Sequence, residues 1–133
     1  MKKVITFGVF DLFHIGHLNL FENIKRLIPD AYLIVAVQDT DFILKYKPNA
    51  KIWYSLDDRI KMIRALRCVD EVIVYNDVYE TLKKVDFDVF AHGPDQSHAS
   101  FQNAIKFCHE NKKTVLEMPR TEHISSSAIK QEI

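Results

Sequence analysis

Two histidines, His14 and His17, are the residues of this sequence whose type and spacing could do chemistry. They stand three positions apart, so one turn of helix would place both imidazoles on the same face. The apolar run Val4–Phe7 before them is typical of a buried parallel strand, and apolar residues at helical spacing follow them. The pair would therefore lie at the N-terminus of a helix, where backbone N–H groups and the helix dipole favour an anion. Since each imidazole can donate a hydrogen bond near neutral pH, the pattern predicts a phosphate-binding pocket.

Two glycines frame the histidines. Gly8 ends the apolar run where the backbone must turn, and Gly16, between the histidines, would let a phosphate approach closely. The histidines alone are equally compatible with a chance pair or with part of a metal site. The preceding strand, the glycine turn and the order of residues from Gly8 to His17 favour the phosphate site.

A second candidate phosphate clamp lies near the C-terminus. Arg120 has a planar guanidinium that fits phosphate oxygens, and Ser125, Ser126 and Ser127 offer hydroxyls and backbone N–H groups at the start of a predicted helix. The simpler interpretation of the serines is an ordinary helix N-cap. The presence of the histidine segment in the same chain favours the clamp.

The composition is that of one globular domain. Among the 133 residues, 18 Lys and Arg balance 18 Asp and Glu. The charge therefore gives no indication of a basic surface that binds nucleic acid or of a charged tail that binds a membrane. Cys68 and Cys108 are too few and too far apart for a disulfide framework or a zinc site. No apolar run has the length of a membrane span, and no signal peptide is recognisable. These features predict a cytoplasmic protein with a single domain over residues 1–133.

Strand and helix patterns alternate along the chain. The segment Phe42–Tyr54 carries lysines without a clear period and is predicted to be a loop. Repeated strand–helix units predict an α/β fold, a Rossmann-like doubly wound domain with a five-stranded, mainly parallel sheet flanked by helices. Strands are predicted at 4–7, 31–37, 69–75, 86–92 and 114–118, and helices at 18–28, 55–68, 78–85, 100–111 and 125–132.

Polar segments follow four of the predicted strands, at 8–17, 39–51, 93–98 and 120–127. The carboxyl ends of parallel strands meet at one edge of the sheet, and ligands bind there where the strand order reverses. The pattern therefore predicts one site built from all four segments.

The residue order of the two candidate phosphate segments carries a family resemblance. The segment Gly8–His17 has the pattern G-x-F-D-x-x-H-x-G-H and resembles the signature of the HxGH-type nucleotidyltransferase superfamily. The segment Arg120–Ser127, R-T-E-H-I-S-S-S, is similar to the R-T-E-G-I-S-T-T motif of small cytidylyltransferases, closest to the glycerol-3-phosphate cytidylyltransferase family. His123 stands where that family has glycine, which adds bulk, whereas Ser126 and Ser127 keep the hydroxyls of the family's threonines.

The resemblance implies a reaction. It is the transfer of CMP from CTP to a small phosphorylated polyol, with glycerol 3-phosphate as the leading acceptor, release of pyrophosphate, Mg²⁺ bound with the CTP, and a homodimer. The alternatives are an adenylyltransferase of the same superfamily, CTP-dependent transfer to another phosphorylated alcohol or amino alcohol, and a non-catalytic nucleotide sensor. A metal-binding module using His14 and His17 would need further ligands, for which Asp11 is the only obvious candidate, and the place of Asp11 in the F-D pair suggests a structural role instead.

The resemblance also implies roles for individual residues. Catalytic contacts are expected from His14, His17, Arg120 and Lys47, and acceptor contacts from Lys45, Asp11 and Arg59. The roles of Lys45 and Lys47 could be exchanged, or one of them taken by Lys51. Nucleotide contacts are expected from Gly8, Val9, Phe10, His14, Gly16, His17, Lys47, Arg67, Asp95, Arg120, Thr121, Ile124, Ser125, Ser126 and Ser127.

Overall fold

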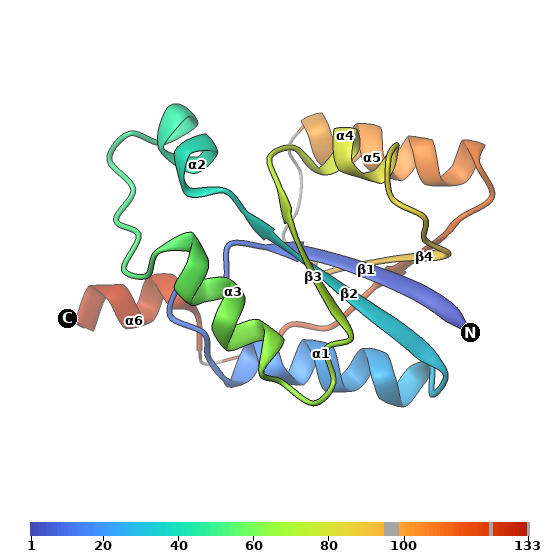
Figure 1. Ribbon diagram of the computed structural model, residues 1–133, viewed down its shortest axis with the longest axis horizontal. Helices are drawn as coiled ribbons and strands as arrows, with labels where there is room; N and C mark the ends of the chain where they lie inside the picture. The colour runs from blue at the N-terminus through green and yellow to red at the C-terminus, as the bar shows by residue number, and fades with distance from the viewer. Residues whose placement is uncertain (95–98, 123, 133) are drawn as a thin grey trace.

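The fold is built on a five-stranded parallel sheet (Figure 1). A computed structural model describes residues 1–94, 99–122 and 124–132. The strands are β1 Lys2–Gly8, β2 Ala31–Gln38, β3 Glu71–Tyr75, β4 Val89–His92 and β5 Thr114–Glu117, in the spatial order β3-β2-β1-β4-β5. All four neighbouring pairs are parallel, which confirms the predicted α/β, doubly wound architecture.

Successive side chains of a strand point to opposite faces of the sheet, and in the central strands both sets are apolar. A layer of helices therefore covers each face. On β1, Val4 belongs to one buried cluster and Ile5 to the other. Helices α1 (Ile15–Leu27) and α3 (Leu56–Arg64) pack on the first face, and α4 (Val78–Leu82) and α5 (Ala99–Glu110) on the second (Figure 1). No helix in the described part of the chain is long and apolar enough to cross a membrane.

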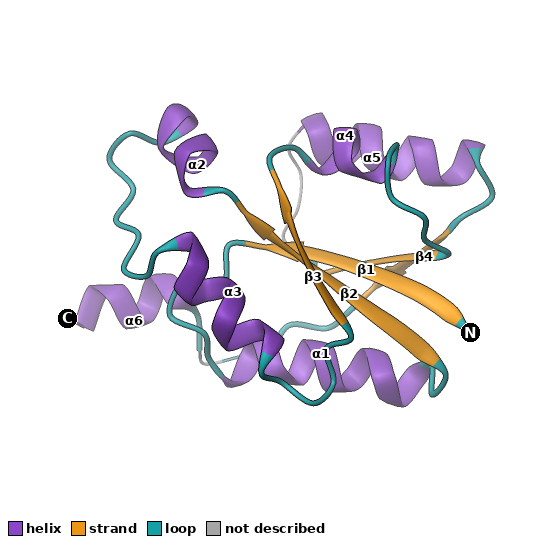
Figure 2. Ribbon diagram, viewed as in Figure 1, coloured by secondary structure: helices purple, strands orange, loops and turns teal. Residues whose placement is uncertain are grey.

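Two short helices lie at the carboxyl ends of the strands, α2 (Thr40–Tyr46) and α6 (Ser126–Glu132) (Figure 2). The prediction of a loop throughout 42–54 is wrong for the part that forms α2. The helix begins where the carbonyl of Asp39 accepts a hydrogen bond from the N–H of Ile43 at 3.1 Å. Only Ile43 of this helix is buried, so the sequence shows no apolar period there. The remaining residues, 47–54, connect α2 to α3 without regular structure.

The strand order reverses between β1 and β4. From β1 the chain builds outward through β2 to β3, then crosses back to place β4 on the other side of β1. The carboxyl ends of these two strands border a common crevice, which is where a parallel sheet binds its ligand. Strands β3 and β4 begin two and three residues later than predicted, at Glu71 and Val89.

Candidate active site

His14 and His17 cap the first helix with their own rings. The backbone N–H of Gly16 donates to Nδ1 of His14 at 3.0 Å, and the backbone N–H of His14 donates to Nδ1 of His17 at 3.2 Å. The two rings stack with centroids 3.9 Å apart. Because each Nδ1 accepts a hydrogen bond, each neutral ring carries its proton on Nε2. The capping geometry therefore leaves one N–H donor on each imidazole.

Both histidines are held in the neutral form. Burial and, to a smaller extent, the nearby His14 together lower the pKa of His17 to about 4. Burial also lowers the pKa of His14, and so does the positive charge of Arg120. At pH 7 the pair therefore offers two neutral N–H donors rather than two positive charges.

The loop between β1 and α1 is tightly wound around Phe10. Phe10 and Leu12 have left-handed backbone conformations, with φ of 56° and 50°. The Phe10 ring lies over Gly8, where an added Cβ would approach it to 2.6 Å, and meets the ring of His17 edge-on with centroids 5.2 Å apart. At Gly16 an added Cβ would come within 2.7 Å of the His14 ring. Both glycines therefore leave room for aromatic rings of the loop itself.

A cavity of about 350 Å³ opens beside the histidines at the carboxyl ends of β1 and β4. It brings residues Gly8–His17, here called the histidine loop, together with Arg120 and with residues Ser125–Ser127, here called the serine segment. Arg120 and the serine segment lie more than a hundred positions away from the histidines in the sequence. This is the juxtaposition that the sequence predicted. Its lining comprises Thr6, Phe7, Gly8, Val9, Phe10, His14, Gly16, His17, Leu20, Gly93, Pro94, Pro119, Arg120, Thr121, Ile124, Ser125, Ser126 and Ser127. The predicted residue Asp95 lies outside the described residues.

The serine segment is fastened to the histidine loop by its own side chains. Oγ of Ser125 accepts from the N–H of Ala128 at 3.0 Å and so caps α6, as the simpler interpretation expected. Oγ of Ser126 donates to the carbonyl of Asp11 at 2.8 Å. Farther along α1, Nδ2 of Asn19 donates to Oγ1 of Thr121 at 3.1 Å. The serines therefore hold the segment against the cavity as well as lining it.

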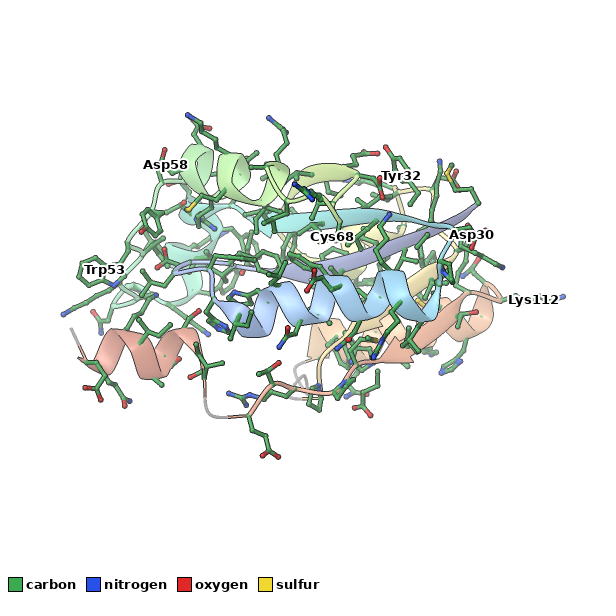
Figure 3. All side chains as sticks on the ribbon, turned by 90° about the horizontal axis from the view of Figure 1, so that it is seen from below. Asp30, Tyr32, Trp53, Asp58, Cys68 and Lys112 are labelled. Atoms are coloured by element: carbon green, nitrogen blue, oxygen red, sulfur yellow. The ribbon has the colours of Figure 1, made fainter. Side chains whose placement is uncertain are left out.

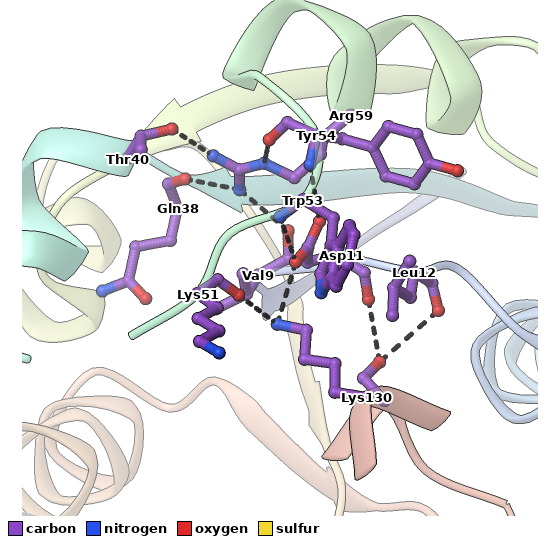
Figure 4. A network of polar contacts seen from close by, with 11 residues as sticks. Val9, Asp11, Leu12, Gln38, Thr40, Lys51, Trp53, Tyr54, Arg59 and Lys130 are labelled. Atoms are coloured by element: carbon purple, nitrogen blue, oxygen red, sulfur yellow. Dashed lines mark hydrogen bonds and ion pairs between the residues drawn. The ribbon is translucent and has the colours of Figure 1, made fainter. Parts of the chain in front are cut away.

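Asp11 has a structural role, because its buried carboxylate binds backbone groups of another segment. Its side chain is 2% exposed, and its carboxylate accepts from the N–H groups of Trp53 and Tyr54 at 2.8 and 3.0 Å (Figure 4). Its Oδ2 also lies 2.8 Å from Nζ of Lys130. With its oxygens bound in this way, Asp11 is not placed to contact an acceptor, and it does not line the cavity. The same bonds argue against a metal module, and among the described residues no three His, Cys, Asp or Glu side chains gather as ligands.

Arg59 is also a structural residue, contrary to its predicted contact with the acceptor. Its side chain is fully buried. The guanidinium donates to the carbonyls of Val9 and Gln38, both at 2.9 Å, and to Oγ1 of Thr40 at 2.6 Å (Figure 4). Arg59 therefore ties the carboxyl ends of β1 and β2 to the start of α2.

Arg67 does not lie near the cavity. It is an exposed residue between the end of α3 and the start of β3. In a parallel sheet that position belongs to the amino ends of the strands, the edge opposite to the histidines. The predicted contact of Arg67 with a nucleotide is therefore wrong for this structure.

A second cavity, of about 730 Å³, lies on the other side of the end of β1. It shares Phe7, Gly8 and Val9 with the first cavity. Lys47 lines it, whereas Lys45 is exposed on α2 with Nζ 5.6 Å from the centre of the Tyr46 ring. Sequence reasoning missed its other lining residues: Gln38, Phe42, Ile43, Tyr46, Tyr75, Asn76, Asp77, Val78 and Ser100. Tyr75, Asn76 and Asp77 end or follow a strand, so the rule of carboxyl ends could have found them.

Comparisons with known proteins identify the family of the chain. The model of the cytidylyltransferase-like family matches residues 5–132. The whole chain is 36% identical to the glycerol-3-phosphate cytidylyltransferase of Bacillus subtilis (strain 168), of which it covers 98%, and 35% identical to that of Staphylococcus aureus (strain NCTC 8325 / PS 47), of which it covers 96%. The FAD synthase of Methanocorpusculum labreanum is 34% identical over 98 residues, which are 72% of this chain and 66% of that protein.

A solved structure has the same fold over nearly the whole chain. It is the lipopolysaccharide core biosynthesis protein from Thermoplasma volcanium GSS1, with a TM-score of 0.69 and 26% identity over 93% of this chain and 99% of that one. Since the family match leaves out only the ends of the chain and two relatives above 30% identity span it entirely, the chain belongs to the cytidylyltransferase-like family and is a nucleotidyltransferase.

Proposed function

We propose that this protein transfers CMP from CTP to a small phosphorylated polyol, with glycerol 3-phosphate as the leading acceptor, to give a CDP-alcohol and pyrophosphate. The observation that carries the proposal is the meeting of His14 and His17 with Arg120 in one cavity at the end of β1. The acceptor is taken from the names of the two relatives that match the chain over its whole length.

The reaction needs positioning and charge neutralisation rather than a side-chain nucleophile. An oxygen of the acceptor phosphate forms a bond to the α-phosphorus of CTP, and the bond from that phosphorus to the bridging oxygen of pyrophosphate breaks. The Nε2–H groups of His14 and His17 donate to oxygens of the α-phosphate as charge develops there. Arg120 binds oxygens of the β- and γ-phosphates. Mg²⁺ would be held by the oxygens of the triphosphate, since the described residues of the cavity offer hydrogen-bond donors and no carboxylate cluster.

The two cavities suit an in-line displacement, in which the attacking and leaving oxygens lie on opposite sides of the α-phosphorus. The triphosphate occupies the cavity of the histidines and Arg120, and the acceptor occupies the cavity of Lys47. Gly8 and Val9 line both cavities, which supports a position for the α-phosphate between the two. Lys47, in the second cavity, then neutralises the negative charge of the acceptor phosphate.

Base preference is the point on which the alternatives differ. The FAD synthase relatives are a reason to test an adenylyltransferase. The test is a screen for pyrophosphate release with CTP, ATP, GTP and UTP against glycerol 3-phosphate and a panel of other phosphorylated polyols and amino alcohols. We expect turnover with CTP and a phosphorylated polyol. Equal or better use of ATP would favour the adenylyltransferase, and nucleotide binding without pyrophosphate release would favour a sensor. The cytoplasmic location and the homodimer stay predictions.

A further inference from the structure

Helix α6 is docked by polar contacts. None of its residues 126–132 is buried, so apolar burial contributes little to its position. At its first turn Ser126 donates to the carbonyl of Asp11. One turn later, Nζ of Lys130 lies 2.8 Å from Oδ2 of Asp11 and 2.7 Å from the carbonyl oxygen of Lys51 (Figure 4). These contacts fix where the helix lies.

The same contacts hold a second segment, residues 47–54. The carboxylate of Asp11 accepts from the N–H groups of Trp53 and Tyr54, and Lys130 binds the carbonyl of Lys51 in the same segment. Figure 3 shows Trp53 at the end of the molecule where α6 lies, away from Asp30 and Lys112. Lys130 and Asp11 therefore join three parts of the chain: the histidine loop, α6 and the segment 47–54.

Each of these three parts carries a piece of the proposed site. Helix α6 begins with Ser126 and Ser127 in the nucleotide cavity, and the segment 47–54 begins with Lys47 in the acceptor cavity. Asp11 lies three residues before His14. On the basis of the proposed function, we propose that Lys130 is a positioning residue that couples nucleotide binding at α6 to acceptor binding at the segment 47–54. Lys130 lines neither cavity, so it acts through Asp11 and Lys51.

The coupling follows from the geometry of the ion pair. The Lys130 side chain is 27% exposed and that of Asp11 is 2% exposed, so water screens the pair weakly. Without Lys130 the carboxylate keeps its backbone donors but loses its counter-charge, and α6 loses the contacts of its second turn. Helix α6 and the segment 47–54 could then move independently. Coupling between binding sites is reciprocal, so each substrate should lose its effect on the affinity for the other.

The chain offers a matched control for the test. Nζ of Lys25 lies 2.6 Å from both Oδ2 of Asp70 and the carbonyl oxygen of Ala31, and its side chain is also 27% exposed. This pair lies at the amino ends of the strands, far from both cavities. Lys25→Met therefore removes the same kind of contact without touching the site, and Lys130→Arg keeps the positive charge at the site.

The experiment measures the KM for CTP at low and at saturating glycerol 3-phosphate in the wild type, Lys130→Met, Lys130→Arg and Lys25→Met. Saturating acceptor should lower the KM for CTP at least about fivefold in the wild type and in Lys25→Met. In Lys130→Met this ratio should fall to within about twofold of one, and Lys130→Arg should restore most of it. Hydrogen exchange of the free proteins should show faster exchange of the Trp53 and Tyr54 amides and of α6 only in Lys130→Met.

Three results would overturn the coupling role. They are an unchanged ratio in Lys130→Met, an equal loss in Lys25→Met, and hydrogen exchange in Lys130→Met that matches the wild type. A wild-type protein that turns over none of the four nucleotides would instead contradict the proposed function, and this result is visible before any variant is made.

Discussion

The backbone N–H of His14 donates to Nδ1 of His17, while Nδ1 of His14 accepts from Gly16 two positions along the chain. The two imidazoles thus satisfy N–H groups at the start of α1, where a helix has donors without internal partners. This arrangement fixes both rings by backbone atoms and fixes the proton of each on Nε2. The histidine pair is therefore a rigid two-donor unit whose geometry depends on the shape of the loop.

Gly16→Ala tests how far that geometry matters. The added Cβ would lie 2.7 Å from the His14 ring, so the ring must move and its hydrogen bond to residue 16 is lost. The protein should still fold, because the ring can turn away, and kcat should fall about a hundredfold since small misplacements of catalytic groups have effects of that size. Gly93→Ala is a control for stability only, because its Cβ would meet no atom of the described residues within 4 Å but Gly93 lines the same cavity. Thermal unfolding of both variants and steady-state kinetics of Gly16→Ala and the wild type make the comparison, and wild-type kcat in Gly16→Ala would show that the cap is dispensable.

The pH dependence of stability should report His17. Its pKa is about 4 in the folded protein and near 6.5 when unfolded, so the unfolded state binds a proton first as the pH falls. The contribution of His17 to the free energy of unfolding is fully present above pH 6.5 and decreases toward pH 4, by about 3 kcal/mol in total. Denaturant unfolding of the wild type and of His17→Asn at several pH values should show this difference. An NMR titration of His17 with a midpoint near 6.5 would contradict it.

Arg120→Lys separates a phosphate clamp from a surface charge. Lysine keeps the charge but loses the planar fork that binds two oxygens at once. Charge grows on the leaving pyrophosphate in the transition state, so kcat should fall and the KM for CTP should rise, with the KM for the acceptor changed less. If Arg120 only paired with a surface acid such as Glu122, a contact of at most about 1 kcal/mol, all three constants would stay within a few fold. Arg67→Lys, at the opposite edge of the sheet, should leave the constants unchanged.

Arg59→Met should act on stability. It removes the buried guanidinium that donates to the carbonyls of Val9 and Gln38, which should reduce the free energy of unfolding by about 3 kcal/mol. The exposed Arg67, changed to Met, should alter it by less than about 0.5 kcal/mol. Urea unfolding of both variants measures the difference. If Arg59→Met were as stable as the wild type and only the KM for the acceptor were raised, the result would support a role of Arg59 in acceptor binding.

The strands and the position of the cavity could be predicted from the sequence because both depend on local patterns. The strands were predictable because their apolar runs are buried on both faces, and the cavity was predictable because polar segments follow the strand ends. Helix α2 was missed because one buried residue, Ile43, makes no period. The F-D pair indicated a structural role for Asp11, but neither its partners nor the structural role of Arg59 could be predicted, since these partners are mainly backbone groups brought close by the fold. Phe42 and Tyr46 of the second cavity were missed because they belong to that same unpredicted helix.

The most direct test of the histidine pair is the turnover of His17→Ala with CTP and glycerol 3-phosphate. The variant loses one hydrogen-bond donor to the α-phosphate, where charge develops in the transition state. Its kcat should therefore fall at least about a hundredfold while the protein stays folded. His109→Ala, which changes an exposed histidine of α5, is the control and should keep the wild-type kcat. A folded His17→Ala protein with unchanged kcat would show that the histidines do not stabilise the transition state.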